Sequence, residues 1–199
     1  MPFLLDEGGR SMDDNIISDN SRCKVKECED KIIKYYKYEE NFNMEYNVYK
    51  KMGEKPYLAK IIKPDFDNQC IELERLFLPN LYKYINDKNE IPKYLLNSMQ
   101  KISLEFLEKN ISIIDDLFKV EHIFIDDKNA KNPYGLKIID FESCKNIKDY
   151  EYDSYRQLII STFRELNNRE EEFNEQFNYS PQEIVHRFYI NKEPQICCD

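Results

Sequence analysis

The sequence predicts an α+β fold in which a strand-rich front part precedes a mostly helical part. Three observations support this prediction. Short apolar runs separated by turn residues fill the chain before Pro79, as in an antiparallel sheet. After Pro79, apolar residues recur every three or four positions, as on the buried face of a helix. Two apolar runs, at residues 122–126 and 136–141, interrupt the helical part and predict a hairpin.

The front part is predicted to form two strands, a helix and two further strands. Residues 1–17 are mixed in character and are expected to be a flexible leader. The expected strands span residues 24–28, 31–38, 56–63 and 69–76. Between the second and third strands, Met44, Val48 and Met52 are spaced by four, which predicts a helix over residues 43–52 that ends at Gly53.

The back part is predicted to be helical apart from its hairpin. The expected helices span residues 81–85, 92–110, 152–166 and 181–189. The second of them is the longest, and Pro92 suits its first turn because that position needs no backbone N–H. The hairpin turn at residues 127–135 is rich in Asn, Lys and Pro.

Composition restricts the classes of function. The chain has 199 residues, enough for one large domain or two small lobes that share a cleft. Its formal net charge of −9 argues against nucleic-acid binding, which needs a basic surface. No apolar stretch approaches the ~20 residues of a membrane span. We therefore expect a soluble chain without nucleic-acid partners.

The six cysteines match no zinc pattern, because no C-x-x-C is present and only two histidines occur. No secretory signal is recognised, so we expect free thiols in a reducing cytoplasm. The adjacent Cys197 and Cys198 are either a redox pair or part of a loose tail.

The most informative segment is Leu-Lys-Ile-Ile-Asp-Phe-Glu at residues 136–142. Its apolar residues predict a buried strand, and Asp140 falls where that strand leaves the core. A carboxylate at this position can hold a cation without burying an unpaired charge. A solvated acid that ends a strand is the alternative interpretation.

The order of these segments resembles the protein-kinase-like superfamily over residues 18–190. The resemblance implies a bilobal fold. Residues 18–78 would form an N-lobe with a small antiparallel sheet and one helix, and residues 79–199 a mostly helical C-lobe. It also implies ATP and Mg²⁺ as cofactors.

The resemblance assigns four nucleotide-binding residues. Lys34 falls on the strand that carries the family's phosphate-binding lysine, and Glu45 on the next helix would pair with it. Backbone groups from Glu74 to Leu76 would meet the adenine edge. The alternatives are a strand-edge lysine, a solvated helix glutamate and a plain core strand.

Residues 113–125 resemble the kinase catalytic loop, in two registers. In one register, Asp116 is the catalytic base and Glu121 takes the metal-binding position. In the other register, Leu117 takes the position of the base and His122 takes the metal-binding position. We prefer Asp116 as the base, because a loop can accommodate one inserted residue more easily than the reaction can proceed without its carboxylate. The resemblance further implies that Asp140 holds Mg²⁺.

Three departures from the family pattern bear on function. All three glycines of the phosphate-binding loop are replaced, by Ser18, Asn20 and Cys23, although Val25 is kept. Glu142 stands where Asp-Phe-Gly has its glycine. The segment from Asp140 to Asp153 is short, and the resemblance makes Asp153 the buried acid that orients the catalytic loop.

Two functions from different classes follow, and a third interpretation stays open. The first is a minimal ATP- and Mg²⁺-dependent phosphotransferase of unknown acceptor. The second is a pseudokinase that binds a nucleotide or a protein without transferring phosphate. The third is an α+β domain with no relation to kinases.

Overall fold

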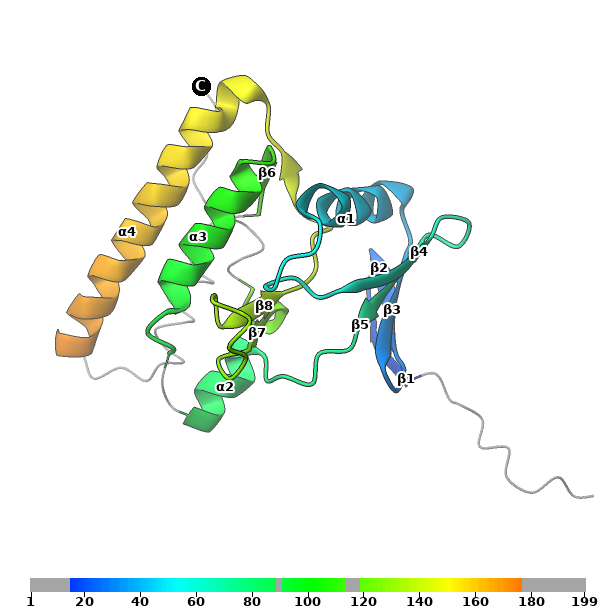
Figure 1. The fold of residues 1–199 in the computed structure, drawn as a ribbon, viewed down its shortest axis with the longest axis horizontal. Helices are drawn as coiled ribbons and strands as arrows, with labels where there is room; N and C mark the ends of the chain where they lie inside the picture. Colours follow the sequence, from blue (N-terminus) through cyan, green and yellow to red (C-terminus); the bar gives the residue numbers. More distant parts are fainter. Residues whose placement is uncertain (1–14, 89–90, 114–118, 177–199) are drawn as a thin grey trace, which may run out of the picture.

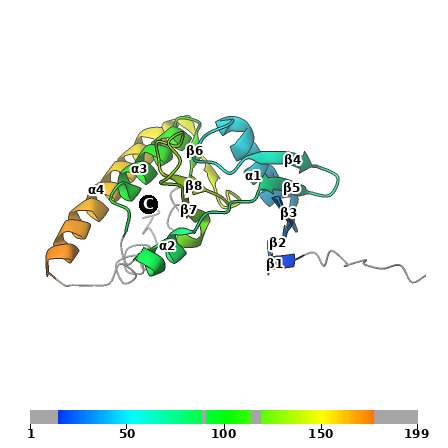
Figure 2. The ribbon, with the colours of Figure 1, turned by 60° about the horizontal axis from the view of Figure 1, so that its bottom comes forward.

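The computed structural model describes residues 15–88, 91–113 and 119–176 and has an α+β fold. A five-stranded antiparallel sheet with helix α1 occupies one side, and helices α3 and α4 run side by side on the other (Figures 1 and 2). The expected α+β class, with strands first and helices later, is therefore confirmed.

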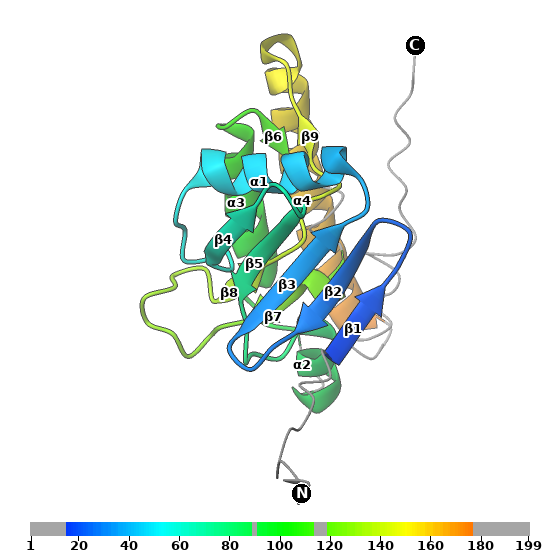
Figure 3. The same cartoon turned by 90° about the vertical axis from the view of Figure 1, so that its right-hand side faces the viewer.

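The sheet has the strand order β1-β2-β3-β5-β4, and every neighbouring pair is antiparallel. Its strands are β1 (Asn15–Asp19), β2 (Cys23–Glu27), β3 (Lys31–Tyr36), β4 (Ile61–Asp65) and β5 (Cys70–Glu74). Helix α1 (Glu39–Met52) connects β3 to β4 and lies across one end of the sheet (Figure 3). It ends at Gly53, whose φ of 66° lies in the left-handed region that glycine favours.

The regular structure in the rest of the described chain consists of helices and two small antiparallel strand pairs. The helices are α2 (Leu81–Lys88), α3 (Leu95–Leu107) and α4 (Tyr152–Gln176), with short 3-10 turns η1 (Val120–His122) and η2 (Asp149–Glu151). Strand β6 (Ile111–Ser112) pairs with β9 (Lys145–Asn146), and β7 (Ile123–Ile125) pairs with β8 (Leu136–Ile138). The β7–β8 pair is the hairpin expected from the sequence.

Several expected boundaries were wrong, among them the end of the helix expected at residues 152–166, which continues to Gln176. Strand β1 begins at Asn15, inside the expected leader, because residues 15–19 pair with β2. The strand expected at residues 56–63 begins at Ile61 and continues through Pro64 to Asp65. Since β4 is an edge strand, the missing N–H of Pro64 is tolerated there. Residues 1–14 and the helix expected at 181–189 lie outside the described residues.

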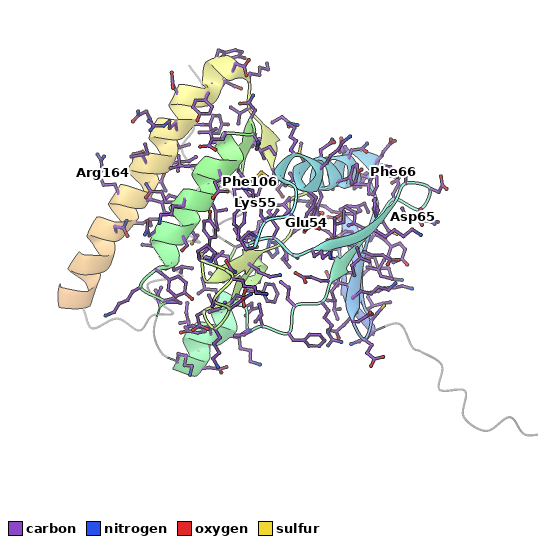
Figure 4. The ribbon with its side chains drawn as sticks, viewed as in Figure 1. Glu54, Lys55, Asp65, Phe66, Phe106 and Arg164 are labelled. Atoms are coloured by element: carbon purple, nitrogen blue, oxygen red, sulfur yellow. The ribbon has the colours of Figure 1, made fainter. Side chains whose placement is uncertain are left out.

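A buried aromatic cluster connects the sheet side to the helical side. Phe141, which directly follows Asp140, is fully buried between Tyr49 of α1 and Phe106 of α3, with ring centroids 5.4 and 5.6 Å apart. Figure 4 shows Phe106 projecting from α3 toward α1. The Phe141 ring thus anchors the segment that carries Asp140.

None of the described helices has the length and apolar character needed to cross a membrane. None of the four cysteines within the described chain forms a disulfide there, as expected. Cys197 and Cys198 lie outside it.

Candidate functional site

Lys34, Glu45 and Asp140 meet in space although they are far apart in the sequence. The Lys34 Nζ lies 2.7 Å from Glu45 Oε2 and donates a hydrogen bond to the Asp140 carboxylate. A third carboxylate, that of Glu142, has its Oε2 3.3 Å from the same nitrogen. The Lys34 side chain is only 7% exposed and that of Glu45 is fully buried. Lys34 is therefore no solvated edge lysine, and Glu45 is no solvated helix residue.

Local structure explains this convergence. Lys34 lies on β3, a central strand of the sheet, and alternation places it on the same buried face as Tyr36. Glu45 lies on the buried face of α1 with Val48 and Tyr49. Asp140 has a φ of 70°, a left-handed conformation that Asp adopts more readily than most residues.

Two further side chains complete the site. The His122 Nδ1 lies 3.3 Å from Asp140 Oδ2. The Ile139 N–H donates to the His122 carbonyl at 3.1 Å, so the β7–β8 hairpin holds His122 beside Asp140. Arg22 Nη1, from the β1–β2 turn, lies 3.6 Å from Glu142 Oε1 and donates to Ser143 Oγ at 3.1 Å.

The cluster keeps Lys34 and Asp140 charged. Burial opposes the charge on Lys34, but the carboxylates of Glu45, Asp140 and Glu142 outweigh it and raise the Lys34 pKa well above its ordinary value. Burial likewise opposes ionisation of Asp140, but the Lys34 ammonium and then His122 lower the Asp140 pKa. Burial dominates at Glu45 and raises its pKa despite Lys34.

The donor set fits a hard divalent cation. Ligand oxygens of Glu45, Asp140 and Glu142 all lie within 4.8 Å of one another, and Mg²⁺ prefers carboxylate oxygens. Glu45 Oε1 is buried without a hydrogen-bond partner in the described chain, and the buried Glu142 Oε2 has only its 3.3 Å ion pair with Lys34. The Tyr49 hydroxyl is also buried without a hydrogen-bond partner in the described chain. Among the described residues, the three carboxylates pair with only two lysine or arginine cations, Lys34 and Arg22, so the cluster is net negative when all three are ionised.

Of the other predicted metal ligands, His122 lies at the site and Glu121 does not. His122 contacts Asp140, whereas the neighbouring Glu121 is exposed on η1 and is not one of the three clustered carboxylates. Asp116 and Leu117 lie outside the described residues, so the catalytic-loop register stays a prediction. Asp153, expected to be buried, is exposed in the first turn of α4, where an acid complements the helix dipole. That expectation was wrong.

The segment expected to meet adenine is mostly engaged in the sheet. The Glu74 N–H donates to the Lys60 carbonyl at 2.9 Å, and the Glu74 carboxylate accepts from the Lys60 N–H at 3.0 Å. That carboxylate also pairs with Lys137 of β8. Leu76 follows β5 and is half-buried. The Glu74 groups therefore serve the strand, which leaves Leu76 as the candidate for an adenine contact.

The β1–β2 turn, which replaces the glycine-rich loop, is closed by its own side chain. Asn20 Oδ1 accepts hydrogen bonds from the backbone N–H groups of Arg22 and Cys23, at 2.8 and 2.9 Å. The Asn20 N–H donates to the Cys23 carbonyl at 3.0 Å. These three N–H groups are already satisfied, so they do not form a phosphate cradle.

A cavity of about 520 Å³ lies near the site but does not include it. It adjoins the end of α1 and the linker to β4, where Figure 4 labels Glu54 and Lys55. Tyr49 and Lys137 also line it, whereas Lys34 and Asp140 do not. The titratable cluster, and not this cavity, is the candidate functional site.

Glu142 is the site residue that the family pattern did not assign. The signal for it was present, because a glutamate replaces the expected glycine two residues after Asp140. Comparison with protein-family models finds no match to the chain, and comparison with curated proteins finds none either. The function is therefore inferred from the geometry of the site.

Proposed function

We propose that the chain is a small kinase-like phosphotransferase that uses ATP and Mg²⁺. The observation that carries this proposal is the convergence of Lys34 from β3, Glu45 from α1 and Asp140 from the segment after β8. These are the lysine, helix glutamate and metal-binding aspartate that the family resemblance assigns. Their meeting around one buried ammonium is not expected of an unrelated α+β domain.

The arrangement of the elements supports the same proposal. A five-stranded antiparallel sheet with one helix between its third and fourth strands corresponds to a kinase-like N-lobe at residues 18–78. Helices α2, α3 and α4 correspond to a C-lobe that begins near residue 79. The small β7–β8 hairpin ends next to Lys34, where the family carries its metal-binding residue.

Each residue has a role in this proposal. Lys34 would neutralise a phosphate, and Glu45 would hold Lys34 in position. Asp140 and Glu142 would hold Mg²⁺, which supplies charge neutralisation between phosphates. Asp116 would accept the proton of the acceptor hydroxyl.

A second candidate function is a binding module without phosphoryl transfer. The Asn20-closed turn favours it, because a turn with satisfied N–H groups does not cradle a transferring phosphate as a glycine-rich loop does. In this case the site would bind a nucleotide, or the surface a protein partner, while the chemistry is absent.

Transfer of labelled γ-phosphate distinguishes the two functions. We would compare the wild type, Asp116→Asn and Asp140→Asn, by autophosphorylation and with a broad acceptor panel. Asp87→Asn, at an exposed position of α2, is the matched control. The enzyme predicts transfer by the wild type and the control that both site variants lose. Equal background in all four proteins, under conditions where ATP binds, would establish the binding module instead.

A further inference from the structure

The missing glycines leave the proposed nucleotide site short of phosphate ligands. Backbone N–H groups are the usual donors of a phosphate-binding turn. In the β1–β2 turn, the N–H groups of Asn20, Arg22 and Cys23 are engaged within the turn. Any phosphate held near Lys34 therefore needs another donor from this part of the chain.

The same turn supplies a cation at the site. Arg22 extends from the turn to the segment after β8, where Nη1 lies 3.6 Å from Glu142 Oε1 and donates to Ser143 Oγ. Its side chain is 54% exposed, whereas that of Lys34 is 7% exposed. Arg22 can therefore be reached from solvent, whereas Lys34 is buried.

The Glu142 carboxylate shows where an anion fits between these two cations. One of its oxygens lies 3.6 Å from Arg22 and the other lies 3.3 Å from Lys34. A guanidinium is a planar fork whose N–H groups match the oxygens of a carboxylate or a phosphate. A phosphate group presents the same kind of oxygen pair with a greater negative charge.

We propose that Arg22 and Lys34 together bind the phosphates of a nucleoside polyphosphate, with Arg22 replacing the backbone donors that the closed turn does not offer. This inference rests on the proposed function and deepens it, because it names the residue that selects for phosphate number. Binding exchanges the ion pairs of Glu142 for contacts with phosphate oxygens. Ligands with more phosphates gain more from Arg22, and adenosine gains nothing.

Calorimetric titration of the full chain tests this assignment. ATP, ADP and adenosine would be titrated into the wild type, Arg22→Gln and Arg22→Lys. Arg164→Gln, an exposed arginine on α4, makes the same charge change at a distant position (Figure 4). The melting temperature of each variant is measured as a control that the substitution leaves the fold intact.

The expected result is a loss that depends on the phosphates. Arg22→Gln should weaken ATP binding about tenfold, the typical effect of losing one charge-assisted hydrogen bond, and leave adenosine binding unchanged. Arg22→Lys should fall between the wild type and Arg22→Gln, because it keeps the charge and loses the fork. Arg164→Gln should bind ATP as the wild type does.

Three outcomes would overturn the inference, and they are distinguishable from one another. If the wild type binds ATP and Arg22→Gln binds it equally well, Arg22 is no phosphate ligand, and the proposed function survives. If Arg22→Gln weakens adenosine and ATP by the same factor, its role is structural. A wild type that binds none of the three ligands contradicts the proposed function together with the inference.

Discussion

Replacing Lys34 with Met should strongly destabilise the protein and thereby reveal how the carboxylate cluster is balanced. Met has a similar length and no charge, so the substitution removes the ammonium while largely conserving the volume. The ammonium contacts Glu45, Asp140 and Glu142, and the first of these is fully buried. Its loss leaves three carboxylates facing one another in the interior.

Breaking a buried ion pair by removing one partner costs about 3–5 kcal/mol. For a chain of this size, each kcal/mol lowers the melting temperature by roughly 2–4 °C, so we expect a decrease on the order of 10 °C. The matched control is Lys31→Met on the same strand. Lys31 pairs with Glu72 at 2.9 Å but is 31% exposed, and such a pair contributes about 0–1 kcal/mol.

The loss should also depend on pH, and the sign follows from the pKa shifts. Lys34 lowers the Asp140 pKa from its ordinary 3.8, so Asp140 stabilises the fold above that pH and loses this effect as pH falls through the folded-state pKa. The Glu45 pKa is raised from 4.5, chiefly by burial. The stability that Glu45 contributes in its protonated form is therefore fully present below pH 4.5 and is lost as the pH rises through the folded-state pKa. In Lys34→Met, Asp140 and Glu45 must ionise without the ammonium that pairs with them in the wild type. The loss of unfolding free energy relative to wild type should therefore be largest at neutral pH and smaller in acid.

Urea unfolding at neutral pH and at about pH 5, followed by circular dichroism, measures this deficit. A Lys34→Met protein as stable as Lys31→Met at neutral pH would refute the reasoning. So would a deficit that grows as the pH falls.

Three further predictions concern the framework around the site. Phe106→Ala should lower the free energy of unfolding by about 3–5 kcal/mol in urea melts, because the fully buried Phe106 ring packs against that of Phe141. A loss below about 1 kcal/mol would contradict this packing. Gly135→Ala should cost about 1–3 kcal/mol, since Gly135 has a φ of 67° and an added Cβ would lie 2.7 Å from the Tyr94 ring; an unchanged melting temperature would argue against this backbone. Burial opposes ionisation of Glu105, but hydrogen bonds from Tyr134, Lys55 and Tyr57 lower its pKa. Glu105→Gln should therefore remove stability that the wild type shows above pH 4.5 and loses in acid. Parallel curves of stability against pH for the two proteins would refute this.

Periodicity predicted most of the fold because the relevant signals are local. The four-residue spacing in α1 and the apolar runs of β3, β5, β7 and β8 each specify an element through burial of one face. Strand β1 was missed because its residues are largely exposed and it depends on pairing with β2. The start of β4 was misplaced because its Pro64 is acceptable only at a sheet edge, and edge position is a property of the whole sheet.

The site was predictable only where a family pattern carried long-range information. Lys34, Glu45 and Asp140 could be chosen together because the resemblance relates residues that lie far apart in the sequence. Glu142 was marked only by its replacement of a family glycine, and Arg22 carried no such signal, since their roles depend on two loops meeting across the site. Asp153 was expected to be buried, but local sequence cannot tell a buried first-turn acid from the exposed one observed.

The most direct test of the central claim is the effect of Mg²⁺ on ATP binding to the wild type and to Asp140→Asn. Calorimetric titrations with excess Mg²⁺ and with a chelator give the metal-dependent part of the affinity. The account predicts that Mg²⁺ strengthens ATP binding to the wild type and that Asp140→Asn removes this gain while retaining the weaker metal-free binding. Wild-type protein that binds no ATP, or a Mg²⁺ effect of equal size in both proteins, would contradict it.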